Sequence, residues 1–447
     1  MRRIGAGCFF LMVSLSAFSP GAGAGEPLTL TLDEAVTRAL DQNLDLKKSL
    51  IDLSTAEYAS GQLWAELFPT ISAGLGADYS TGLFTGSGFE LDRKNGSYSA
   101  SLGISLNLSA GIPHTMKMIR LAWQTELLNY EDARRRLEIE TTKNFYSLLA
   151  DGENIHFLEE SLELARRQFD NNQIAFNNGL MGEMSLLQSR LEVETARFNL
   201  SAGRAAYANR MGEFLALLGL EHDRETVLAG KLSVARVDAD PDKLIRENLP
   251  GRPDIVNLKR TVERLRYTEK RNRLESRAPS IRLETQWGGA GENAEEFADS
   301  LRGAISLSIP LDSWIPGTKT ARSLRSDGAE LEKAELDLKN AGIAAVSQIR
   351  SLTANLRNSW ESIEIARLRV SVAERTYTLT EEGFRNGTVE SMVLADARNN
   401  LADARQRLLM SELSYQTMML DLSAAVNADW KEFFKSPEVD TQGPGQG

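Results

Sequence analysis

The sequence predicts a mainly α-helical protein that also contributes strands to a transmembrane β-barrel. It also predicts that one structural unit is duplicated within the chain. Three observations support this fold class. Two long stretches lack proline and are rich in helix formers, four segments alternate apolar and polar residues, and the second half of the chain repeats the pattern of the first. Each copy should therefore hold two strands and a long coiled-coil helical hairpin.

Residues 1–24 have the three parts of a secretory signal peptide. Arg2 and Arg3 supply the positive start, an apolar core opens at Cys8, and a small-residue cleavage site ends at Ala24. Because Cys8 is the only cysteine in 447 residues, the mature chain is expected to contain no thiol and no disulfide. We therefore expect an exported protein.

The chain is acidic, with 51 basic and 62 acidic side chains and a formal net charge of -11. A surface of this sign repels nucleic-acid phosphates, so no nucleic-acid partner is expected. After the signal peptide, no segment reaches about eighteen consecutive apolar residues, the length that a membrane-spanning helix requires.

Strands are predicted by four segments in which apolar and polar residues alternate with period two. In the second segment Ile104 alternates with Ser105, and in the fourth Leu307 alternates with Ser306. The polar, glycine-rich stretches between paired strands are typical of hairpin loops. A sandwich with one wet face is the alternative for these segments alone. The expected strands are at about 70–80, 97–109, 280–288 and 301–311.

Long helices are predicted by two stretches without proline, 114–240 and 317–436. Apolar residues recur every seven positions in both, and each series changes phase at a glycine, Gly179 in the first and Gly387 in the second. A sustained heptad indicates helices that supercoil side by side, and a phase break indicates a turn. Rods of ~95 Å follow from 1.5 Å per residue. The expected helical hairpins are at about 114–220 and 317–427.

The two halves match at a fixed spacing. Phe384 and Gly387 lie 208 positions after Phe176 and Gly179, and the same spacing holds along many turns of helix. Such self-similarity predicts a repeated structural unit. The expected organisation after the signal peptide is a first repeat at 25–240, a second repeat at 241–435 and a disordered tail at 436–447.

Four strands are too few to close a barrel, for which about eight is the practical minimum. The apolar face of each strand still needs lipid or another sheet, and the rods have several sides to cover. Both needs are met if several chains contribute strands to one transmembrane barrel and hairpins to one α-helical cylinder. The polar strand faces would then line a water-filled lumen, and the apolar faces would contact lipid.

This duplicated plan resembles the TolC-like outer membrane factor family, the channels of outer-membrane efflux and secretion, over nearly all of the mature sequence. The stretch 249–254, which reads LPGRPD, looks like the segment that opens the family's second repeat, and 39–46 is its first-repeat counterpart. Phe-x-x-Gly followed by a heptad helix occurs in both copies. Pro69 and Pro279 precede strands, as in the family.

The resemblance implies a homotrimer with a twelve-stranded barrel, in contact with outer-membrane lipid, and a periplasmic helical cylinder. It also implies a periplasmic adaptor protein and an inner-membrane pump as partners. The expected function is an outer-membrane channel subunit that gives an exit duct for substrates delivered by the pump through the adaptor, in efflux or type I secretion. An exported soluble coiled-coil adaptor or scaffold is the alternative, but it needs neither four alternating strands nor a full-length duplication.

The resemblance also suggests where a constriction would lie. Family members often carry acids just after the turn in the second copy, and Asp396 fits one such position. Glu390 and Glu183 lie near the two tips, whereas Val393 stands where another acid can occur in the family and Ser185 occupies the comparable first-copy position. The candidate constriction is therefore Asp396, Glu390 and Glu183, and a solvated helix face is the alternative for each.

The two hairpin tips are the expected docking sites for the adaptor. Gly179 and Gly387 are the only breaks in two long heptad rods, so the tips should lie farthest from the barrel. A glycine preceded by asparagine is consistent with a residue at positive φ. Phe176 and Phe384, three residues before the glycines, complete the candidate tips.

No pattern of catalytic, cofactor-binding or metal-ligating residues is evident in the sequence. His114, His156 and His222 lie far apart without ligand spacing, and the mature chain should have no cysteine. No glycine-rich loop between a strand and a helix is placed to hold phosphate, and no nucleophile has a recognisable setting. The sequence therefore predicts a conduit without a cofactor and without enzymatic activity.

Overall fold

The computed structural model describes residues 28–80, 95–221, 226–291 and 298–428. The expected signal peptide and the expected tail at 436–447 lie outside these ranges. Three short 3-10 helices, at Leu63–Leu67, Leu249–Gly251 and Asp312–Trp314, join longer elements. Those longer elements are β1 (Leu28–Thr31), α1 (Leu32–Gln42), α2 (Leu44–Gly61), β2 (Thr70–Ser80), β3 (Asn95–Leu108), α3 (Ile112–Asn177), α4 (Glu183–Leu217), β4 (Thr226–Ala229), α5 (Pro241–Asn248), α6 (Pro253–Glu275), β5 (Ser280–Gly291), β6 (Ala298–Ser308), α7 (Lys319–Arg385) and α8 (Ser391–Val426).

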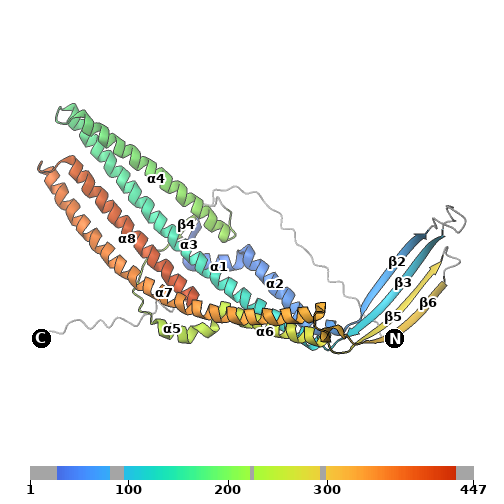
Figure 1. The fold of residues 1–447 in the computed structure, drawn as a ribbon. Helices are drawn as coiled ribbons and strands as arrows, with labels where there is room; N and C mark the ends of the chain where they lie inside the picture. The colour runs from blue at the N-terminus through green and yellow to red at the C-terminus, as the bar shows by residue number, and fades with distance from the viewer. Residues whose placement is uncertain (1–27, 81–94, 222–225, 292–297, 429–447) are drawn as a thin grey trace, which may run out of the picture.

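The molecule is elongated, with β2, β3, β5 and β6 at one end and the tips of two helical hairpins at the other (Figure 1). The hairpins are α3 with α4 and α7 with α8. The helices α3 and α7 have 66 and 67 residues, so each is about 100 Å long at 1.5 Å per residue. α2 packs along α3, and α6 packs along α7, near the strand end. None of the helices in the described ranges is both long and apolar enough to cross a membrane.

The four long strands form one antiparallel sheet in the order β2-β3-β5-β6. Ile104 pairs with Ile71 on one side and Thr285 on the other, and Leu307 pairs with Ile281, so these residues share one face. Polar residues occupy the opposite face. In the part of the chain that the structure describes, β3 and β5 each pair with a strand on both sides, whereas β2 and β6 each have one unpaired edge.

β6 differs from the expected range because of its register with β5. Ser280, the first residue of β5, pairs with Ser308, and Ala290 pairs with Ala298. The ladder therefore begins about three residues before the expected start at 301 and ends about three residues before 311. The apolar residues beyond it, such as Ile309, lead into α7 rather than into the sheet.

A charge-reversed ion pair supports the spacing of 208 between the two hairpins. Arg204 of α4 binds Glu159 of α3 at 2.6 Å. The residues 208 positions later are Glu412 of α8 and Arg367 of α7, and they bind each other at 3.0 Å. The same point of contact between antiparallel helices is thus kept with the charges exchanged, so the two hairpins are structural copies.

The heptad residues of the first hairpin form the core between its helices, as the sequence predicted. Leu162 of α3 packs with Val193 and Leu200 of α4 in one buried cluster. A Cβ added to Gly203 would approach the Leu158 side chain to 2.9 Å, so glycine lets the helices come close there. The absence of a side chain at Gly203 therefore makes room for Leu158 between the two helices.

Two features of the middle of the molecule are absent from the sequence prediction. β1 and β4 form a separate parallel pair in which Leu30 lies opposite Leu228. The linker before α5 crosses the second hairpin, where the Tyr415 hydroxyl donates to the Ala235 carbonyl oxygen (3.0 Å) and accepts from the Val237 N–H (2.9 Å). Tyr415 is fully buried, so these bonds fix the linker to α8.

The LPGRPD segment begins α6 and ties it to α7. Arg252 donates from Nε and one terminal nitrogen to the Asp254 carboxylate, at 3.0 and 2.7 Å, and the same terminal nitrogen lies 3.1 Å from Gln348 of α7. Burial alone would raise the pKa of Asp254, but the bonds and charge of Arg252 bring that pKa below its ordinary value. The motif thus acts as a structural connection in this chain.

Candidate functional site

The first hairpin turn satisfies the last carbonyl groups of α3 with two backbone hydrogen bonds. Gly179 donates its N–H to the carbonyl oxygen of Phe176, and Leu180 donates to that of Ala175; both N···O distances are 2.9 Å. This is the Schellman pattern, in which the residue after the helix adopts a left-handed conformation. Gly179 has a φ of +70°, which glycine adopts without steric cost.

The second turn, between α7 and α8, repeats this motif. Gly387 has a φ of +71° and donates to the Phe384 carbonyl oxygen at 3.0 Å. Thr388 donates both its N–H and its hydroxyl to the Gly383 carbonyl oxygen, each at 2.9 Å. Phe384 is partly buried, and Phe176 in the first turn is 36% exposed. Both turns lie at the end of the molecule opposite the strands (Figure 1).

The three acids of the candidate constriction all lie near these turns, on exposed surface. Glu183 is the first residue of α4, Glu390 is the N-cap residue of α8, and Asp396 lies in the second turn of α8. Within the described ranges, the side chains of Glu183 and Asp396 make no hydrogen bond or ion pair with another residue. The constriction therefore stays a prediction.

Glu390 is the acid that the structure brings against the other hairpin. It lines a cavity of about 110 Å³ together with Asn172 of α3 and Ser185 and Glu192 of α4. Asn172 is buried, and its side-chain oxygen accepts a hydrogen bond from Gln168 at 3.0 Å. The cavity between the tips is thus lined mainly by polar side chains, whereas the cluster around Leu162 farther along the first hairpin is apolar.

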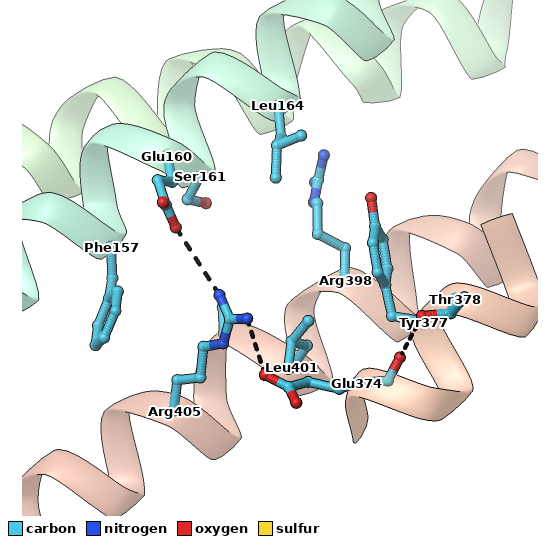
Figure 2. Close-up of a pocket in the computed structure, with 11 residues that line it drawn as sticks. Phe157, Glu160, Ser161, Leu164, Glu374, Tyr377, Thr378, Arg398, Leu401 and Arg405 are labelled. Carbon is cyan, nitrogen blue, oxygen red and sulfur yellow. Dashed lines mark hydrogen bonds and ion pairs between the residues drawn. The ribbon is translucent and has the colours of Figure 1, made fainter. Parts of the chain in front are cut away.

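Sequence reasoning missed the ion pairs of the seam where the two hairpins meet. Arg405 of α8 binds Glu374 of α7 at 2.9 Å and reaches Glu160 of α3 at 4.0 Å, so one guanidinium joins both hairpins (Figure 2). Arg398, two turns nearer the tips, lies 3.5 Å from Glu192 of α4.

The duplication in the sequence identifies these arginines as repeated residues, but it does not indicate which acids they bind. Arg405 and Arg398 lie 208 positions after Arg197 and Arg190, so all four were visible as repeated residues. Arg197 nevertheless binds Glu194 of its own helix at 2.9 Å. The partner of each copy depends on which helix packs beside it, and this is a property of the tertiary structure.

The long helices lie in the order α4, α3, α8, α7, because α3 packs with both α4 and α8, and α8 packs with α7. This order leaves α4 and α7 at the two flanks of the subunit. Both flanks carry apolar side chains that are at least half exposed in the single chain. They are Leu180, Met184, Leu187, Leu191 and Phe198 on one flank and Ile365, Leu368, Val372 and Leu379 on the other.

Within the residues that the structure places, no group of three or more His, Cys, Asp or Glu side chains is arranged to hold a metal ion. The arrangement that the structure does provide is a two-faced sheet with open edges at one end and paired rods with matching tips at the other. This arrangement is that of a subunit of an assembled membrane channel, because the described sheet has two unpaired edges and both flanks expose apolar side chains.

The chain belongs to the outer membrane efflux protein family, whose sequence profile matches residues 35–220 and 244–428. Outer membrane protein TolC of Salmonella enteritidis is 23% identical over 434 residues, which cover 93% of this chain and 84% of that protein. Toxin and drug export protein A of Aggregatibacter actinomycetemcomitans is 22% identical over 359 residues, covering 77% and 73%.

A solved structure with the same fold is the CmeC outer membrane channel of Campylobacter jejuni. It matches with a TM-score of 0.73 and 18% identity over 90% of this chain and 88% of that one. Family membership confirms the TolC-like interpretation. The protein is an outer-membrane efflux channel subunit with a periplasmic helical extension, and it is not an enzyme. Nothing in the comparisons favours the soluble adaptor.

Proposed function

We propose that three copies of this chain form one exit duct, with a twelve-stranded barrel in the outer membrane and a helical cylinder in the periplasm. The observation that carries this proposal is the four-stranded sheet with open edges on β2 and β6. About eight strands are needed to close a barrel, so one chain is insufficient. Three copies supply twelve strands if β6 of each pairs with β2 of the next, which closes a ring.

The apolar flanks of the hairpins support the same arrangement. α4 runs away from its tip and α7 runs toward its tip, so α4 of one copy and α7 of the next would pack antiparallel. Phe198 on α4 and Leu368 on α7 are 72% and 65% exposed in the single chain. Phe198 follows Gly179 by 19 residues and Leu368 precedes Gly387 by 19 residues, so the two side chains lie at similar heights along the rods. Pairing of the flanks would bury both stripes, and apolar burial favours assembly.

The first test is the state of the purified full-length protein. Because a single copy leaves two sheet edges and two apolar flanks uncovered, we expect only trimers after gentle detergent extraction, measured by native mass spectrometry. Leu368→Glu should shift the population toward dissociated chains, and Glu361→Gln, on the same helix, should not. A monomer that keeps the full helical circular dichroism would contradict the proposal.

We propose further that the hairpin tips receive a periplasmic adaptor, through which an inner-membrane pump delivers cargo. Two matching turns at the far end of the subunit would give a threefold trimer six tips in one ring. Leu180 and Met184, beside the first turn, are 81% and 80% exposed, which favours contact with another protein. The N-terminal ends of α4 and α8 have no side-chain cap, so they present backbone N–H groups that a partner can cap.

Asp396 is proposed to be part of the periplasmic constriction, with Glu390 and Glu183 nearby. Three copies of an unpaired carboxylate within a Debye length of the pore axis would attract cations. We expect Asp396→Asn to lower the preference for cations over anions by roughly a factor of a few in single-channel recordings.

The control for this prediction is Asp403→Asn. Asp403 lies seven residues farther along α8, on the same side of the helix, but Arg407 already binds it at 2.7 Å. Its removal should change selectivity less. Unchanged selectivity and conductance in the Asp396 variant would rule out the constriction at this residue.

A further inference from the structure

A cavity of about 410 Å³ opens in the seam between the two hairpins, lined by residues of α3, α7 and α8. Phe157 and Leu164 of α3 form one wall, and Leu401 of α8 forms the other (Figure 2). This volume lies within the range of about 300–1,000 Å³ that is usual for small-molecule sites. The cavity thus has the size and the apolar walls of a binding site.

Arg398 supplies a charged donor that the protein leaves unused. Its side chain is only 13% exposed, and its Nε atom is buried without a hydrogen-bond partner. One terminal nitrogen lies 3.5 Å from Glu192, at the limit of a hydrogen bond. Buried polar groups are nearly always bonded, so an unpaired charged donor calls for an acceptor.

The other charged groups of the cavity already have partners. Arg405 binds Glu374 at 2.9 Å and reaches Glu160 at 4.0 Å. The guanidinium of Arg405 therefore neutralises acids of both walls. Arg398 is therefore the cation of this cavity that has an unpaired N–H group. Glu192 is the acid that would compete with a bound anion for its guanidinium.

Tyr377 of α7 provides a second donor beside Arg398. Figure 2 shows its hydroxyl and the Arg398 guanidinium extending side by side toward α3, into the space next to Leu164. Burial raises the pKa of Tyr377, and Glu381 raises it further against the effect of Arg398 and Arg385. The hydroxyl consequently stays protonated and able to donate at neutral pH.

We propose that this seam cavity binds an amphipathic organic anion. Its carboxylate or sulfonate would accept hydrogen bonds from the Arg398 guanidinium and the Tyr377 hydroxyl, and its apolar body would pack between Phe157, Leu164 and Leu401. Charge-assisted bonds of this kind are the strong ones in protein sites. This proposal goes beyond the exit duct, because it concerns side chains of α3, α7 and α8 and not the barrel or the hairpin tips.

The experiment is a calorimetric titration of the full-length protein in lipid nanodiscs, with empty nanodiscs subtracted. The probes are 2-naphthoate and its neutral isostere 2-naphthamide. We expect saturable binding of one naphthoate per chain and at least about tenfold weaker binding of the amide, since only the anion uses the charge of Arg398.

Variants assign the binding to this cavity. Arg398→Gln should weaken naphthoate binding about tenfold or more, and Tyr377→Phe should weaken it by a smaller factor. Glu192→Gln should strengthen it, because the competing carboxylate is gone. The matched control is Arg190→Gln, which changes the repeat counterpart of Arg398 at an exposed position of α4 and should leave the affinity unchanged.

Ala402→Phe tests the site without removing a charge, since Ala402 lines the cavity and a larger side chain would fill it. We expect this variant to lose naphthoate binding while its circular dichroism and its oligomeric state stay as in the parent. Equal affinity for the acid and the amide, binding that does not saturate, or full binding by both Arg398→Gln and Ala402→Phe would overturn the proposal.

Discussion

Ile104→Arg is expected to prevent assembly in the outer membrane, whereas Ser105→Arg at the next position should assemble. Ile104 lies between Ile71 and Thr285 on the apolar face of the sheet, and Ser105 lies on the polar face opposite Glu284. An arginine on the lipid face costs roughly 2–4 kcal/mol near the bilayer midplane, and three copies would place three such charges in one barrel. An arginine at position 105 would instead lie opposite the Glu284 carboxylate on the neighbouring strand β5.

The second strand hairpin gives an independent pair of variants. Leu307 lies opposite Ile281 on the apolar face, and Ser306 lies opposite Arg282 on the polar face. Leu307→Arg should therefore fail to assemble. Ser306→Arg should assemble but with some loss, because like charges directly opposite each other cost up to about 1 kcal/mol.

The measurement for all four variants is the amount of trimer in purified outer membranes, determined by quantitative immunoblotting of samples that were not heated. The expected order is Ser105→Arg, then Ser306→Arg, with the two apolar-face variants at or near zero. If all four variants assembled equally well, the assignment of the two sheet faces would be wrong.

The sequence predicted the parts of the fold that repeat or alternate over many residues. Long strands show period two and coiled-coil rods show period seven, and both patterns arise directly from which side chains are buried. β1 and β4 escaped prediction because each has only four residues and its partner is far away in the sequence. β1 contacts α1 and β4 contacts α3, so their pairing accompanies the packing of α1 on α3, which a four-residue pattern does not indicate.

In the candidate site, too, some features could be predicted from the sequence and others could not. The glycine turns were predictable, because a positive φ at Gly179 and Gly387 restricts the residue type at two repeated positions. The seam was not predictable. Arg197 and Arg405 are equivalent in sequence, but only Arg405 faces the other hairpin, while Arg197 binds its own helix. The burial of Arg398 likewise depends on neighbouring helices, which bring Glu192 of α4 and Tyr377 of α7 close to it.

The double variant Gly179→Val, Gly387→Val is expected to leave trimers in the outer membrane but to abolish export. Each glycine has a positive φ and open space around the position of a Cβ, so the cost is backbone strain and not a collision. A left-handed conformation costs an L-residue roughly 1–2 kcal/mol, and a β-branched side chain tolerates it least. The Schellman turns should therefore rearrange, while the sheet at the opposite end keeps its pairing.

Gly182→Val is the matched control for this prediction. Gly182 lies in the first turn, also with open space around its Cβ position, but its φ of -78° is accessible to every residue. Export is measured in cells that carry the matching adaptor and pump, and trimer by immunoblotting of outer membranes. We expect wild-type export from Gly182→Val and none from the double variant at equal trimer levels, because the turn conformation and not the tip's side-chain bulk is what a partner would recognise. Normal export by the double variant would exclude the tips as the docking end.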